Sequence, residues 1–197
     1  GDGKISNGTN KLGDTGDYRI IGNSTPRFKY GITLDAAWKG FDFSIFMQGI
    51  GKRDLWLDGC YFWGANGQGN EWQSTGFAEH WDFFRPEGDP LGANLNSYYP
   101  RVNFSGDRNT KVQTRYLQNG AYLRLKNVQL GYTLPRVWTE KAGISSVRVY
   151  VSGDNLATIT SLSKIFDPEA TGSLAGTGSG KLYPLQRVIS VGVNVNF

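Results

Sequence analysis

The last eleven residues of the chain, 187–197, alternate between apolar and polar side chains. The apolar positions on one face are Ile189, Val191, Val193, Val195 and Phe197. Val188 is the one apolar residue on the opposite face. A period of two predicts a β-strand with one apolar and one polar face. A membrane-spanning strand needs about 9–11 residues, so this strand is long enough to span a bilayer, although a soluble strand can show the same pattern.

The same alternation occurs in four further segments, and we predict strands at about 28–38, 41–51, 115–134, 146–156 and 187–197. Lys39-Gly40 separates the first two and has the composition of a tight hairpin turn. The alternation changes phase near Lys126-Asn127. This change indicates either a β-bulge or an upper half of the strand that projects beyond the apolar zone.

Short and long connections alternate between the predicted strands. Residues 39–40 and 135–145 form the short connections, whereas residues 52–113 and 157–185 form long loops. Outer-membrane barrels have short periplasmic turns and long extracellular loops. We therefore predict an all-β chain whose five antiparallel strands form part of a large transmembrane β-barrel. In this orientation the two long loops are extracellular and the C-terminus is periplasmic.

Aromatic side chains gather where the predicted strands meet the short turns, as in the aromatic girdle at a membrane interface. The predicted interface aromatics are Trp38, Phe41, Tyr132, Trp138 and Phe197. The predicted lipid-facing side chains are Ile32, Leu34, Phe43, Ile45, Val149, Val191, Val193 and Val195. A single-chain bacterial barrel has at least about eight strands. The two outer strands should therefore pair with strands outside this chain, because open edges are not tolerated in lipid.

The loop 52–113 contains four of the six tryptophans and many other aromatic residues. A short helix is predicted within residues 74–84. The aromatic rings can either bury one another in a small core or offer their faces to a ligand or partner. The candidates for ligand or partner contact are Trp63, Trp72, Trp81 and Tyr98.

The composition limits the chemistry of the chain. His80 is the one histidine and Cys60 the one cysteine. No catalytic pair or metal-ligand spacing emerges around them, so we predict no enzyme activity, no catalytic residue, no metal site and no cofactor. Lysine and arginine are scattered despite a net charge of +4, and no nucleic-acid-binding motif occurs. Asp2-Gly3-Lys4 matches only the middle of a calcium-binding loop and is interpreted as an ordinary turn.

Five stretches of the chain resemble the C-terminal end of SusC/RagA-type TonB-dependent outer-membrane transporters. They lie at residues 20–49, 116–135, 147–160, 166–169 (FDPE) and 184–197, in the order and spacing of that family. The resemblance implies a plugged barrel of about 22 strands in the outer-membrane lipid. It also implies import of oligosaccharides or peptides energised by TonB, and a SusD-like surface lipoprotein as a lid. The plug, the TonB-contacting segment and the remainder of the barrel would lie N-terminal to Gly1.

Two alternatives stay open at this stage. A soluble β-sandwich carbohydrate-binding module is built from similar strands and aromatic residues, and its apolar faces meet in a dry core. A siderophore or haem receptor of the same barrel type would differ only in its cargo. What covers the apolar faces of the strands separates the module from the barrel, whereas the sequence does not identify the cargo.

Overall fold

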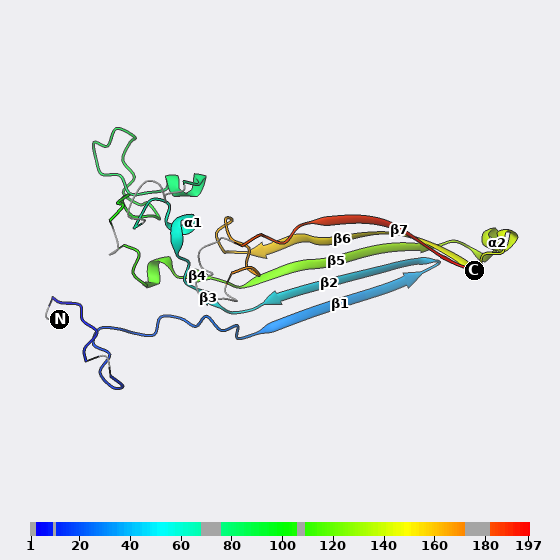
Figure 1. The fold of residues 1–197 in the computed structure, drawn as a ribbon, viewed down its shortest axis with the longest axis horizontal. Helices are drawn as coiled ribbons and strands as arrows, with labels where there is room; N and C mark the ends of the chain where they lie inside the picture. Colours follow the sequence, from blue (N-terminus) through cyan, green and yellow to red (C-terminus); the bar gives the residue numbers. More distant parts are fainter. Residues whose placement is uncertain (1–2, 10, 68–75, 106–108, 172–181) are drawn as a thin grey trace.

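The computed structural model describes residues 3–9, 11–67, 76–105, 109–171 and 182–197. Its main element is a five-stranded antiparallel sheet of order β1-β2-β5-β6-β7. The strands are β1 (Lys29–Trp38), β2 (Phe41–Ile50), β5 (Tyr122–Thr133), β6 (Ser146–Thr160) and β7 (Val188–Asn196). Figure 1 shows them side by side in a long sheet, with the long connections at one end and the short turns and C-terminus at the other.

Short elements occupy the connections. The long connection between β2 and β5 contains β3 (Asp54–Leu55), α1 (Gly59–Trp63), η2 (Ala78–Trp81), η3 (Thr114–Tyr116) and β4 (Gln118–Asn119). α2 (Arg136–Thr139) and η4 (Glu140–Ala142) join β5 to β6. Within the part of the chain that the structure describes, no helix has the length and apolar character needed to cross a membrane.

The strand register places apolar residues on one face of the sheet and polar residues on the other. Directly opposed residues share a face, so a row across the sheet has one character. One row consists of Ala36, Phe43, Leu130, Val151 and Val191. The adjacent row consists of Asp35, Ser44, Gln129, Ser152 and Ser190. The two-faced sheet confirms the alternation read from the sequence.

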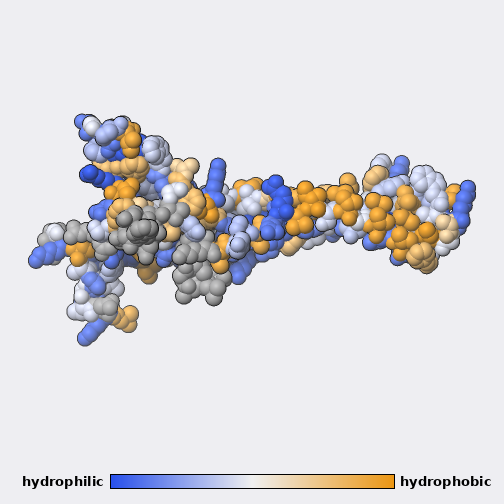
Figure 2. Space-filling model, turned by 45° about the horizontal axis from the view of Figure 1, so that its top comes forward, coloured by the Kyte–Doolittle hydropathy of each residue, from blue (hydrophilic) through white to orange (hydrophobic). Residues whose placement is uncertain are grey.

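The apolar face of the sheet is exposed. Of the eight side chains predicted to face lipid, Ile45 is half-buried and the other seven are exposed, Val191 to 73%. Figure 2 shows apolar residues gathered along the strands toward the short-turn end. Among the described residues, the second sheet contains β3 and β4 and lies at the loop end (Figure 1). The dry two-sheet core expected of a β-sandwich module is therefore not formed by these residues.

The turn between β1 and β2 has the conformation that a two-residue hairpin favours. Lys39 and Gly40 have φ angles of 46° and 88°, both in the left-handed region. Type I′ turns require positive φ at both central positions, and their twist matches that of the flanking strands. Trp38 and Phe41 are consequently paired directly across the turn.

A β-bulge explains the phase change in the third long strand. The register shifts between Leu125 and Asn127, which leaves Lys126 without an opposed residue on β2. The extra residue returns Leu125 and Val128 to the same apolar face on either side of the bulge. Of the two interpretations of the sequence pattern, the bulge is confirmed.

Two predicted strand boundaries are wrong. The strand predicted at 115–134 begins at Tyr122, because residues 114–116 form η3 and residues 118–119 pair with β3 instead. The strand predicted at 146–156 continues to Thr160, because residues 157–160 pair with residues 122–125. Within the predicted helix at 74–84, the 3₁₀ helix η2 covers Ala78–Trp81, and residues 74–75 lie outside the described residues.

The two edge strands do not pair with each other in the described residues. β1 pairs with β2, and β7 pairs with β6. Among the described residues, the outer edges of β1 and β7 therefore have no strand partner. This arrangement matches a segment of a barrel wall, which closes only with additional strands.

Candidate functional site

An aromatic core at the long-loop end, called the loop core below, joins both long connections. Its buried residues are Leu55, Leu57, Phe62, Trp63, Tyr99, Tyr116, Leu162 and Phe166. Leu162 and Phe166 belong to the segment that follows β6, whereas the others belong to the connection between β2 and β5. The two connections therefore fold as one body at the long-loop end of the sheet (Figure 1).

Ring contacts give the loop core its shape. The ring centroid of Phe62 lies 5.0 Å from Trp63, 5.8 Å from Tyr99 and 6.3 Å from Phe166. The rings of Trp63 and Tyr116 are 4.7 Å apart in an edge-to-face arrangement. Each such pair contributes about 0.5–1.5 kcal/mol beyond its area burial. For these rings, the small-core interpretation of the aromatic-rich loop holds.

The four aromatic residues predicted to contact a ligand or partner have different surroundings. Trp63 is 2% exposed, so its ring supports the loop core from inside. Trp81 is 61% exposed, and the Arg85 guanidinium carbon lies 5.4 Å from its ring centre. Tyr98 is half-buried, and its hydroxyl accepts a hydrogen bond of 2.7 Å from Gln118 Nε2. Trp72 lies outside the described residues.

His80 fixes the position of η2 against α1. The backbone N–H of Phe77 donates to His80 Nδ1 at 3.1 Å. Because Nδ1 accepts, the proton is on Nε2, which donates to the Phe62 carbonyl at 3.1 Å. Both ring nitrogens therefore have structural partners, and the histidine positions the residues that follow it.

A groove of about 620 Å³ opens beside the loop core, and we call it the Tyr98 groove. Its polar side chains come from both long connections: Glu79, Asp82, Tyr98, Tyr99, Arg115, Gln118, Asn119, Ser161 and Ser163. Burial raises the pKa values of Tyr98 and of Tyr99, which also lines the groove. Like an unperturbed tyrosine, both phenols are protonated at neutral pH, and the raised pKa values keep them so at higher pH.

A buried ion cluster attaches residues 161–171 to the polar face of the sheet. The Arg124 guanidinium lies 2.8 Å from Asp167 Oδ1 and 3.2 Å from Glu169 Oε2. Lys126, at the bulge, lies 3.0 Å from Glu169 Oε2. The side chains of Arg124 and Asp167 are only 4% and 8% exposed. The FDPE segment that contains these carboxylates is therefore bound directly to β5.

The electrostatics of Asp167 follow from this cluster. Burial by itself would raise the pKa of the Asp167 carboxyl. Hydrogen bonds from Arg124 and from the backbone N–H groups of Glu169 and Leu185 outweigh burial and lower the pKa. Asp167 is therefore ionised at neutral pH, so the pair with Arg124 is a true ion pair.

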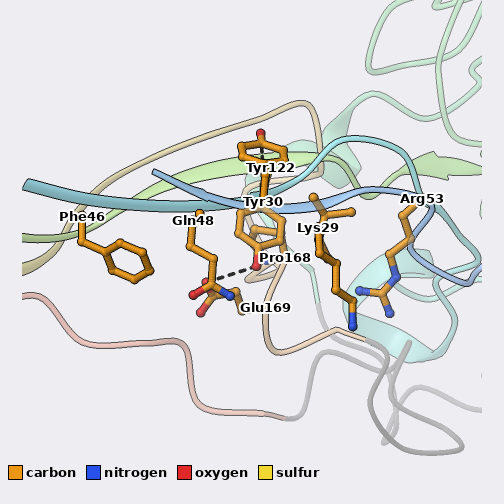
Figure 3. A pocket seen from close by; sticks show the side chains of 11 residues that line it. Lys29, Tyr30, Phe46, Gln48, Arg53, Tyr122, Pro168 and Glu169 are labelled. Carbon is orange, nitrogen blue, oxygen red and sulfur yellow. Dashed lines mark hydrogen bonds between the residues drawn. The ribbon is translucent and has the colours of Figure 1, made fainter. Parts of the chain in front are cut away.

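A second pocket, of about 580 Å³, lies between the outer ends of β1 and β2 and the FDPE segment. Figure 3 shows Lys29, Gln48, Arg53, Tyr122 and Glu169 around it. The Tyr122 hydroxyl donates to Glu169 Oε1 at 3.2 Å, so the same carboxylate serves the pocket and the ion cluster. The pocket is therefore bounded by side chains that already hold the loop.

The aromatic residues predicted for the membrane interface gather at the opposite end. Four of them have exposed side chains: Trp38, Phe41, Trp138 and Phe197. The ring centroid of the fifth, Tyr132, lies 4.5 Å from that of Phe41. They occupy the end that holds the β1–β2 turn, α2 and the C-terminus (Figure 1). The structure thus brings these five residues to one end of the sheet, while their contact with a membrane stays a prediction.

Sequence reasoning missed two charge groupings on the polar face. One is the cluster around Arg124, whose partners are more than 40 residues away in the chain. The other is Arg148, whose Nε donates to Asp42 Oδ2 at 2.8 Å. A Cβ on Gly131 would collide with this second pair. A glycine inside a strand is a signal for such close approach, and it could have pointed to the pair.

Among the described residues, no group of three or more His, Cys, Asp or Glu side chains is placed to hold a metal ion. Asp2, from the partial calcium-loop motif, lies outside these residues.

Two curated proteins match the whole chain. The chain is 32% identical over 207 residues to TonB-dependent receptor P3 of Formosa agariphila. It is 29% identical over 207 residues to TonB-dependent receptor P26 of the same organism. The chain spans only 18% and 19% of the lengths of these two relatives. No family model matches the chain.

The solved structures that match the chain include two states of a peptide importer. The RagAB peptide importer in the closed-closed state matches with a TM-score of 0.68 and 26% identity, over 95% of this chain and 19% of that chain. Its open-open state matches with a TM-score of 0.65 and 27% identity, over 95% and 19%. The matched proteins are receptors and transporters, in agreement with the prediction that the chain is not an enzyme.

Proposed function

We propose that this chain, a segment of a TonB-dependent receptor, forms part of the wall and outer loops of a membrane barrel. Such receptors are outer-membrane proteins. The proposed barrel imports an oligosaccharide or a peptide. The observation that carries the proposal is the two-faced sheet. Each of its five strands has exposed apolar side chains, and its outer edges have no strand partner among the described residues.

The dimensions of the sheet suit a bilayer. The strands contain 9 to 15 residues. A tilted membrane strand requires about 9–11 residues, so each strand is long enough to span a bilayer. Unpaired backbone groups in hydrocarbon cost several kcal/mol each. In the proposed barrel, the outer edges of β1 and β7 pair with strands from the rest of the receptor. The polar face, with Asp42 and Arg148, faces the barrel interior and its plug.

The asymmetry of the connections supports one orientation. In the proposed orientation, the β1–β2 turn, α2 and Phe197 lie on the periplasmic side, and the loop core lies outside the cell. Short periplasmic turns and long extracellular loops are the rule in outer-membrane barrels. The exposed girdle residues at the short-turn end then lie at the inner interface of the membrane.

The proposed partners follow from the same family. A SusD-like surface lipoprotein would close over the outer end, and TonB would act through parts of the receptor outside this chain. The likeness to RagAB, a peptide importer with closed-closed and open-open states, supports such a pairing. Trp81 is the best candidate for contact with a partner or ligand, because its ring is largely exposed at the loop end.

The test uses the complete receptor in its own cells. Deletion should abolish uptake of one nutrient from a panel of oligosaccharides and peptides, and re-expression should restore it. The receptor should fractionate with outer membranes and require detergent for extraction. A receptor that is released without detergent, or that has no effect on uptake of any panel member, would contradict the proposal.

A further inference from the structure

We propose that the Tyr98 groove binds the ammonium group of an imported ligand, such as a lysine side chain of a peptide. The inference rests on the proposed import function and names the ligand chemistry of a site in the outer loops. The groove lies between η2, residues 98–99, residues 115–119 and the segment after β6. Every long connection of the chain therefore contributes to it.

Two carboxylates share one side of the groove. Glu79 lies in η2, and Asp82 is the residue that caps its C-terminal end. The backbone N–H of Asp82 donates to the Glu79 carbonyl at 3.3 Å, which closes a 3₁₀ turn. Side chains at positions i and i+3 of a 3₁₀ helix eclipse one another. The turn therefore directs both carboxylates to the same side, and both line the groove.

Neutral groups supply the hydrogen bonds that these carboxylates accept. The Ser163 hydroxyl donates to the Glu79 carboxylate, with Oε1 as its nearer acceptor and Oε2 at 3.0 Å. Asn94 Nδ2 donates to Asp82 Oδ1 at 2.9 Å, and the Tyr98 N–H donates to Asp82 Oδ2 at 3.0 Å. The ion pairs found among the described residues involve neither Glu79 nor Asp82. A carboxylate has about four acceptor sites, so both retain capacity for a cation.

Arg115 lines the same groove but does not neutralise these two acids. Its guanidinium donates to the backbone carbonyls of Ser97 at 2.6 Å and Tyr98 at 3.3 Å. Two carboxylates against one guanidinium leave the groove with an excess negative charge. The groove is also rich in hydrogen-bond acceptors, because these carboxylates accept from neutral donors. Such a groove suits a ligand that has hydrogen-bond donors and a positive charge.

Aromatic surface completes the match to an ammonium group. Tyr98 is half-buried in the groove wall, and its ring centroid lies 4.9 Å from that of buried Tyr99. The face of a tyrosine ring attracts a cation within about 6 Å. The negative charge of Glu79 adds to burial in raising the pKa values of both phenols, in line with the closeness of this carboxylate to both rings.

The test measures binding to the complete receptor in detergent by titration calorimetry. The probe is Gly-Lys-Gly with both termini blocked, and the matched probes are its Nε-acetylated form and a neutral disaccharide. The free lysine form should bind about tenfold or more tightly than the acetylated form, since one charge-assisted contact is lost. Its affinity should also fall with rising salt.

Substitution separates the groove from general surface charge. Glu79→Gln keeps an acceptor for Ser163, so the fold is retained, and it should weaken binding of the lysine probe by about tenfold. Glu87→Gln is the matched control, because Glu87 is exposed on the same loop and does not line the groove. Equal binding of the two peptide forms, equal effects of both variants, or preference for the disaccharide would overturn the inference.

Failure of this inference is distinguishable from failure of the import proposal. Both variants should fractionate with outer membranes like the unmodified receptor, because neither residue lies in the sheet. If the unmodified receptor imports a nutrient but the lysine probe does not bind, the groove inference is overturned and the import function stands.

Discussion

Val193→Arg is the sharpest test of the two faces of the sheet. Val193 lies on the exposed apolar face of β7, opposite Val149 of β6. An arginine there would place its charge against hydrocarbon if the apolar face contacts lipid. Ser190→Arg is the matched control, because Ser190 lies on the polar face opposite Ser152. Asn194 is a poorer control, since it lies opposite Arg148.

The magnitude follows from the depth of Val193. If Phe197 marks the inner interface, four residues at about 3.3 Å each place Val193 about 13 Å along the strand. A tilt of about 40° converts this length to about 10 Å of depth in an apolar band about 25 Å tall. Arginine near the midplane costs about 2–4 kcal/mol and near an interface about 0–1 kcal/mol. Val193→Arg should thus cost about 2–4 kcal/mol, and Val195→Arg, about 5 Å deep, about 1 kcal/mol.

The assay is urea unfolding of the complete receptor refolded into lipid vesicles. The free energy of unfolding should fall most for Val193→Arg, less for Val195→Arg and least for Ser190→Arg. Equal losses for Val193→Arg and Ser190→Arg would refute the assignment of faces. Equal losses for Val193→Arg and Val195→Arg would refute the depth assigned from Phe197.

Three further predictions concern the loops. Arg124→Gln leaves the buried carboxylate of Asp167 without its cation. It should destabilise the attachment of residues 161–171 by about 3 kcal/mol and speed their proteolysis. Lys164→Gln is the control, because the Lys164 side chain is exposed and its loss should have neither effect. The pKa of Asp167 lies below its ordinary 3.8, so this attachment should be constant above about pH 5 and weaken as the pH falls below 3.8. Tryptophan fluorescence measures this acid transition, and Asp167→Asn should lack it. An epitope tag at Gly67 should be accessible on intact cells, and access only after outer-membrane rupture would contradict the proposed orientation.

The sequence by itself determined the strands and their faces. Side chains of a β-strand alternate between its two faces, so consecutive residues encode which face is apolar. The positions 41, 43 and 45 on β2 and 191, 193 and 195 on β7 therefore predicted the exposed apolar face. Lys39-Gly40 predicted the hairpin for a similarly local reason, because the turn depends on the backbone angles of two adjacent residues.

Only the tertiary structure decided how the loops fold and where two strands end. β6 continues to Thr160 because β5 offers it pairing partners, and a single strand's pattern does not contain its neighbour. Leu162 and Phe166 complete a core whose other residues precede them by more than 40 positions. The loops have no repeating period, so burial there depends on contacts between distant segments. For the same reason, Arg124 with Asp167, and Glu79 with Ser163, become neighbours only when the chain is folded.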